Sequence, residues 1–180
     1  ALFMPAIALS DAPGCAAPQR VALRRWALGC LGVHCCALQG GAADGAAVAA
    51  ATEQLLGAAR TAATGAAEEA PEVRLWATKA LMDMVLFFPD CLDDSKSMVI
   101  RELMCDADDA VAAVATEGAC KLLLLNRVGD DTSALEPAIL AELMLVHLLG
   151  VSTPPAPCVA PFFECYPAIA GPSHLALVAE

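Results

Sequence analysis

Proline and glycine divide the sequence into blocks that each have the length of a helix, and this spacing leaves few possible folds. Within these blocks the commonest residue is alanine, the best helix former, at 40 of the 180 positions. Only eight Phe, Tyr and Trp residues occur, and the β-branched residues that strands favour are scarce. The sequence therefore predicts an all-α protein and excludes an all-β domain.

Helix start and stop signals predict seven helices and the beginning of an eighth. Pro71 suits the first turn of the third helix, and Pro89 ends it. The expected N-caps are Asp44, Asp93 or Asp94, Asp106 or Asp108, and Thr132 or Ser133. The expected ranges are 19–39, 44–64, 71–88, 93–105, 106–129, 132–150 and 157–170, with the eighth helix after Gly171 and Pro172.

Three of these helices share a pattern, in segments that begin at Leu23, Val73 and Val111. Each segment has a leading aliphatic residue, a bulky apolar residue three positions later, then alanine, and a small residue three positions after the alanine. The segments start 50 and 38 residues apart, close to the roughly 40–47 residues of HEAT or armadillo units. We therefore expect a HEAT/armadillo-like α-solenoid, a right-handed superhelix of antiparallel helix pairs.

The expected organisation is one repeat segment over 1–180, cut from a longer array because both ends are apolar and no initiating Met is present. Residues 1–18 are expected to be a linker, followed by approximate repeats over 19–64, 71–105, 106–150 and 155–180, the last truncated. The expected repeat-core positions are Trp26, Ala27, Leu31, Trp76, Ala77, Leu81, Val114, Ala115, Phe162 and Phe163.

The net charge of −11 is unevenly distributed. Residues 1–60 carry four Arg against three acids, whereas 61–127 and 128–180 each have a net charge of −6, and no Lys or Arg follows Arg127. DNA binding depends largely on phosphate neutralisation by cations, so DNA binding by this chain alone should be weak or absent. The one candidate basic patch is Arg20, Arg24 and Arg25, with Arg60 or Arg74 nearby, and it is either a solvated face or a contact for DNA or an acidic partner.

Nine cysteines, an odd number, lie mostly in apolar runs, which is typical of buried thiols in a reducing compartment. Cys30, His34 and Cys35 could face one metal ion or form a Cys–His catalytic pair. However, no CxxC spacing exists to complete a zinc site, and packing thiols are the stronger interpretation. No metal, cofactor or catalytic residue is therefore predicted.

Two further patterns have simple structural interpretations. Asp106, Asp108, Asp109 and Glu117 imitate an EF-hand loop, but the position that requires glycine is Val111, so helix capping is expected instead. Windows 26–43 and 143–163 are uncharged but interrupted by glycine, polar residues or proline, and neither predicts a membrane-spanning helix.

An ordered set of five segments resembles the C-terminal region of the condensin HEAT-repeat subunit of the CAP-G type, condensin subunit 3. The segments are ALRRWALGCLGVHCCAL, VRLWATKALMDMVLFFPD, TEGACKLLL, LAELMLVHL and PCVAPFFECYPAIA, which together span about residues 20–175. One departure is that the family usually has an arginine before the Cys-x-x-x-Phe-Phe block, where this chain has Ala156 and Pro157. A second is Pro161, which falls inside an expected helix.

The resemblance implies a non-catalytic subunit that binds a kleisin subunit and works with an SMC ATPase dimer in mitotic chromosome condensation. It also implies that DNA is held by the whole complex, without a membrane or a small-molecule substrate, in the nucleus and on condensed chromosomes, and in the cytoplasm for part of the cell cycle. The alternative function is a generic HEAT or armadillo interaction scaffold, of the transport or phosphatase adaptor type.

Overall fold

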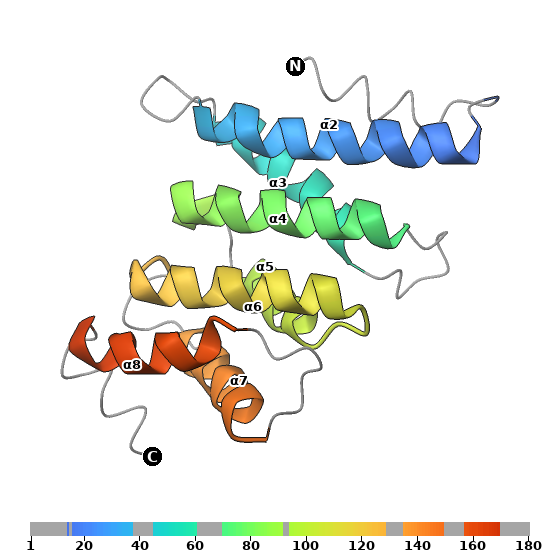
Figure 1. The fold of residues 1–180 in the computed structure, drawn as a ribbon. Coiled ribbons are helices and arrows are strands. Elements are labelled where there is room, and N and C mark those ends of the chain that lie inside the picture. The colour runs from blue at the N-terminus through green and yellow to red at the C-terminus, as the bar shows by residue number, and fades with distance from the viewer. Residues whose placement is uncertain are drawn as a thin grey trace. The chain divides into compact units, whose positions relative to one another are not determined.

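A computed structural model describes Gly14 and residues 16–37, 45–60, 70–91, 94–128, 135–149 and 157–169 (Figure 1). All regular structure in these ranges is helical, which confirms the all-α class. The helices are α2 (Ala17–Ala37), α3 (Gly45–Ala59), α4 (Pro71–Phe87), the 3₁₀ helix η1 (Pro89–Cys91), α5 (Asp94–Met104), α6 (Asp109–Leu124), α7 (Leu135–Leu149) and α8 (Val159–Ile169). No helix in the described ranges is long and apolar enough to cross a bilayer.

The helix boundaries follow the sequence signals where both can be compared. Pro71 opens α4, where its missing N–H costs nothing, and the helix ends before Pro89. Pro161 lies in the first turn of α8, where proline is tolerated for the same reason. The expected caps Asp44, Asp93, Thr132 and Ser133, and the eighth helix, lie outside the described residues.

The end of α6 differs from the prediction, because the helix stops at Leu124 rather than near Gly129. Asn126 takes a left-handed conformation with φ 50°, which Asn tolerates better than most residues. The N–H of Arg127 then donates to the carbonyl of Leu122, and that of Asn126 to the carbonyl of Leu123. This Schellman arrangement satisfies the last carbonyls and turns the chain away.

The chain forms two compact units, residues 1–91 and 92–180. In the first unit, α2 and α4 lie side by side and α3 packs against both (Figure 1). The pairs Arg25–Glu72 and Gly32–Ala80 occur in the same order along both helices, so α2 and α4 are parallel. Equivalent helices of successive repeats are parallel in this way in a HEAT array.

The core of the first unit is built from aliphatic side chains and alanines. Its most deeply buried residues are Ala27, Leu28, Leu55, Ala58, Ala59, Val73, Ala77, Leu81 and Met84, together with Thr52 and Thr78. Arg74 is also buried, at 3% exposure, and its Nε donates to the carbonyl of Ala59 at the end of α3. This bond ties the start of α4 to the end of α3.

In the second unit, α6 packs against α5 and α8, and α7 packs against α5 and α8. The pair α5–α7 is joined by an ion pair of 2.7 Å between Arg101 Nη2 and Glu142 Oε1. Tyr166 near the end of α8 donates to Glu136 at the start of α7 at 2.6 Å, which ties these two helices together. Phe162 of α8 is buried and stacks on Tyr166, with ring centroids 4.9 Å apart.

Each unit therefore has the paired, layered helices that a HEAT-like α-solenoid is made of. The right-handed superhelix and the repeat limits 19–64, 71–105, 106–150 and 155–180 remain predictions. The boundary between the two units at Cys91 falls inside the predicted repeat 71–105.

Candidate protein-binding groove

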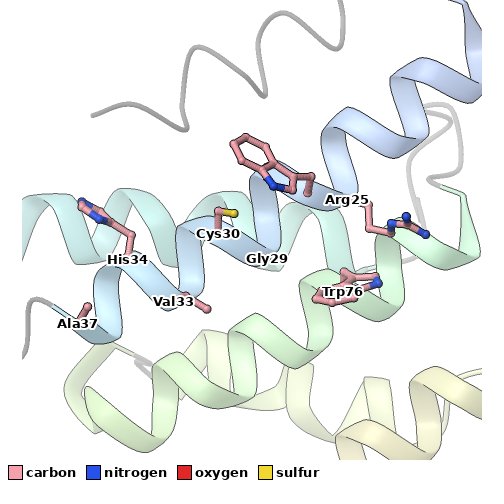
Figure 2. Close-up of a pocket in the computed structure, with 8 residues that line it drawn as sticks. Arg25, Gly29, Cys30, Val33, His34, Ala37 and Trp76 are labelled. Atoms are coloured by element: carbon pink, nitrogen blue, oxygen red, sulfur yellow. The ribbon is translucent and has the colours of Figure 1, made fainter.

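An open groove of about 550 Å³ follows α2 in the first unit (Figure 2). One wall is the outward face of α2 and the other is the indole of Trp76 from α4. Arg25 lies at one end of the groove and Ala37 at the other. The apolar lining comes from Trp26, Gly29, Cys30, Val33, Ala37 and Trp76.

The groove exists because α2 and α4 approach each other very closely. A methyl group built on Gly32 would lie only 2.7 Å from Cβ of Ala80, so only glycine fits there. One turn earlier, a methyl group on Gly29 would lie 3.0 Å from the ring of Trp76. The indole thus rests on the backbone of α2 instead of entering the space between the helices, and the groove opens above it.

Two expected core residues are consequently not in the core. Trp26 is 57% exposed and Trp76 is 42% exposed, whereas the alanine that follows each of them, Ala27 or Ala77, is fully buried. Since each residue advances about 100° around a helix, the position before a buried alanine can point to the side. The close contact at Gly32 leaves no room for an indole between the helices, so both tryptophans lie on the surface.

The other expected repeat-core residues are distributed as follows. Leu31, Leu81, Ala115 and Phe162 are buried, while Val114 and Phe163 are half-buried. Phe163 lies beside His147 of α7, with ring centroids 5.1 Å apart. The small residue that permits the close contact in α2 is Gly32. Cys30, which is the small residue three positions after Ala27 in the shared pattern, is half-buried in the groove.

The three arginines of the candidate basic patch all lie on α2, which contains no acidic residue. Arg20 and Arg25 are exposed and Arg24 is half-buried. Arg25 Nη1 lies 3.6 Å from Glu72 Oε2 in an exposed ion pair, which contributes little to stability. Arg60 is exposed, but Arg74 is buried against the end of α3 and cannot join the patch.

The structure separates Cys35 from Cys30 and His34 on α2. Cys30 and His34 line the groove, whereas Cys35 is buried on another face of the helix. Burial raises the pKa of the Cys35 thiol, which keeps it protonated and a poor nucleophile. Among the described residues no three His, Cys, Asp or Glu side chains gather in a way that could hold a metal ion.

The expectation that the cysteines are buried is wrong at two positions. Cys105 and Cys165 are exposed, while Cys35 and Cys120 are buried. Cys105 comes directly after the end of α5, where its Sγ lies 3.8 Å from Glu142 Oε2. Apolar neighbours in the sequence therefore do not predict whether the thiols of Cys105 and Cys165 are buried.

The acidic run that imitates a calcium loop is a helix cap. Asp108 is the N-cap of α6, and its Oδ1 accepts from the N–H groups of Ala110 and Val111 at 2.9 and 3.3 Å. Asp106 Oδ1 in turn accepts from the N–H of Asp108 at 2.8 Å. The carboxylates of Asp106 and Asp108 thus accept hydrogen bonds from backbone N–H groups at the start of α6, as the sequence predicts.

The sequence does contain a signal for the groove. Trp26, Cys30, Val33 and Ala37 follow the spacing i, i+4, i+7 and i+11 and form one apolar stripe of α2. A second apolar stripe of the same helix, which includes Ala27 and Leu31, faces the core. Because α2 is apolar on both sides, the pattern alone does not tell which stripe is buried within the unit.

Comparison with known proteins gives one family. The chain matches the family described as nuclear condensing complex subunits, C-terminal domain, over residues 13–151. None of the curated proteins or solved structures compared with it is a match. The matched range contains α2 through α7 and covers well over half of the sequence. The chain belongs to the family of nuclear condensin complex subunits, of which it carries the C-terminal domain.

Proposed function

We propose that this chain is a non-catalytic part of a condensin HEAT subunit, which binds the kleisin subunit and acts with the SMC ATPase dimer in mitotic chromosome condensation. The observation that carries the proposal is the family match over residues 13–151. Helices packed in layered pairs agree with it, since such arrays present long surfaces to other proteins. In this function the ATP chemistry belongs to the SMC dimer, and the chain works in the nucleus and on chromosomes, with a cytoplasmic fraction for part of the cell cycle.

The negative net charge of the chain supports a complex in which other parts supply most of the DNA contacts. The chain carries ten cations and 21 acids, so a DNA-holding surface would need basic residues from the kleisin or from other parts of the complex. The groove residues Cys30 and His34 have no role in this function beyond shaping a surface.

Affinity purification of the tagged full-length protein from mitotic cells tests the proposal. We expect kleisin and SMC subunits to be recovered together with it in comparable amounts. Recovery of transport factors or phosphatase subunits in their place would favour the generic scaffold and contradict the condensin function. A double variant with Cys30→Ala and His34→Ala should recover the same partners and support normal chromosome condensation, because neither side chain has a chemical role.

A further inference from the structure

Two thiols from different helices meet in the second unit. Cys120 lies in the second half of α6 and is 3% exposed, while Cys158 comes directly before α8 and is half-buried. The helices α6 and α8 pack against each other (Figure 1), and the thiols of Cys120 and Cys158 share a hydrogen bond. Both cysteines are free, so the structure shows a reduced pair in direct contact.

The position of Cys158 favours a covalent bond between the two sulfur atoms. A disulfide needs them about 2.05 Å apart, closer than a hydrogen bond brings them. Cys158 lies in a turn outside the helix, and its carbonyl accepts from the N–H of Phe162 at 2.9 Å in the first turn of α8. A residue at a helix end can adjust more easily than one inside a helix, because fewer backbone hydrogen bonds hold it.

The two thiols differ in their chemical properties. Burial raises the pKa of both, so at neutral pH each reacts slowly. In Cys158 the hydrogen bond from Cys120 works against this rise of the pKa, whereas in Cys120 the same bond adds to it. Cys158 is also the more exposed of the two. An oxidant therefore reacts first with Cys158, and Cys120 is the buried thiol that stands ready beside it.

We propose that Cys120 and Cys158 form an oxidant-dependent disulfide that clamps the start of α8 to α6. With hydrogen peroxide as the oxidant, the Cys158 thiolate attacks one peroxide oxygen and becomes a sulfenic acid, while the other oxygen leaves as hydroxide. The sulfur of Cys120 then attacks the sulfenic sulfur, and the S–S bond forms as water leaves. In total the two thiols lose two electrons and two protons, and one peroxide becomes two waters.

A dithiol reductant reverses the reaction by thiol–disulfide exchange, so the clamp opens again under reducing conditions. Cys120 and Cys158 are 38 positions apart, and the chain between them contains α7. A bridge over a loop of this length restricts the unfolded chain, and we expect it to raise the melting temperature of the second unit by about 5–15 °C. This inference stands independently of the condensin function, because it rests on the thiol pair alone.

Peroxide treatment of the whole chain, followed by alkylation of the remaining thiols and peptide mass spectrometry, tests the proposal. Trypsin cuts after Arg101, Lys121 and Arg127, so the bridge links peptide 102–121 to peptide 128–180. Each of these peptides holds a second, exposed cysteine, Cys105 or Cys165. The chain with Cys105→Ser and Cys165→Ser therefore serves as the background, and fragmentation spectra of the wild-type peptides provide a second reading. We expect the linked pair to form and to disappear on reduction.

Thermal melts followed by circular dichroism should show the higher melting temperature in the oxidised background and not after reduction. With Cys120→Ala or Cys158→Ser added, oxidation should leave the melting temperature unchanged, and Cys158 without its partner should proceed to the sulfinic acid. Cys30→Ala is the matched control, since Cys30 is half-buried in the first unit and its loss should leave the bridge intact. The proposal is overturned if no linked peptide forms, if Cys158 pairs with another cysteine, or if the bridge forms without raising the melting temperature.

Discussion

At the scale of single residues, α2 and α4 approach each other closely where a glycine faces an alanine. Gly32 faces Ala80 with no space for a methyl group, and the ring of Trp76 packs against Gly29. Gly57 of α3 offers the opposite case, since a methyl group built there would have no neighbour within 4 Å. The same substitution should thus have opposite effects at two helical positions.

We expect Gly32→Ala to destabilise the protein by up to about 2 kcal/mol. Overpacking costs about 1–3 kcal/mol, and the gain in helix propensity of about 1 kcal/mol offsets only part of it. Gly57→Ala should stabilise the protein by up to about 1 kcal/mol. Thermal melts followed by circular dichroism measure both changes, and a melting temperature for Gly32→Ala at or above that of the wild type would show that α2 and α4 are not in this close contact.

A second residue-scale prediction concerns alkaline pH. Burial, together with the carboxylate of Asp83, raises the pKa of the Cys36 thiol from 9.0 to about 11. Between these values the unfolded chain releases the proton while the folded chain keeps it, so stability falls as the pH rises from 9 to 11. Urea unfolding under reducing conditions should show this loss, and Cys36→Ala should show a smaller one. An equal loss in the variant would assign the effect to other thiols or to Tyr166, whose pKa burial also raises.

At the scale of elements, helix ends are held by specific polar contacts. Asp108 caps α6 through two backbone N–H groups, and its neighbour Asp109 lies exposed in the first turn without a cap bond. We expect Asp108→Ala to lower the free energy of unfolding by about 1 kcal/mol, within the usual range of about 0.5–2 for such caps. Asp109→Ala removes only the favourable interaction with the helix dipole and should cost less, about 0.3–1 kcal/mol. Chemical denaturation compares the two, and equal losses would contradict the cap.

The sequence predicts the local features of these elements better than the contacts between them. Helix positions, the place of Pro71 in the first turn of α4 and the cap at Asp108 were predictable because they depend on local signals that act within one turn. The exposure of Trp26 and Trp76 was not, because it depends on the distance between two helices, and that distance is fixed by Gly32 and Ala80. The position of Arg74 was missed for a similar reason: its guanidinium is buried because the end of α3 supplies a carbonyl acceptor.

At the scale of the whole molecule, acidic charge outweighs basic charge and several cations are already engaged. Arg25 is paired with Glu72, Arg101 with Glu142 and Lys121 with Glu117, and Arg74 is buried. A DNA-binding protein needs several cations that can reach phosphates along one track. In the part of the chain that the structure describes, these four cations are already in contact with other groups of the protein.

We therefore expect the isolated chain to bind duplex DNA no more tightly than about 10⁻⁴ M at physiological salt, the weak end of non-specific binding. A mobility-shift titration with a short duplex measures this affinity. Micromolar binding that weakens on combined Arg24→Ala and Arg25→Ala substitution would contradict the prediction and assign a DNA contact to α2.

The placement of the aromatic residues gives the two units different optical properties. Both tryptophans belong to the first unit, and the single tyrosine, Tyr166, belongs to the second. Indole emission under selective excitation therefore arises from residues 1–91 alone, while the ultraviolet absorbance of the phenol arises from residues 92–180. One unlabelled sample can thus reveal which half of the chain loses its structure first during denaturation.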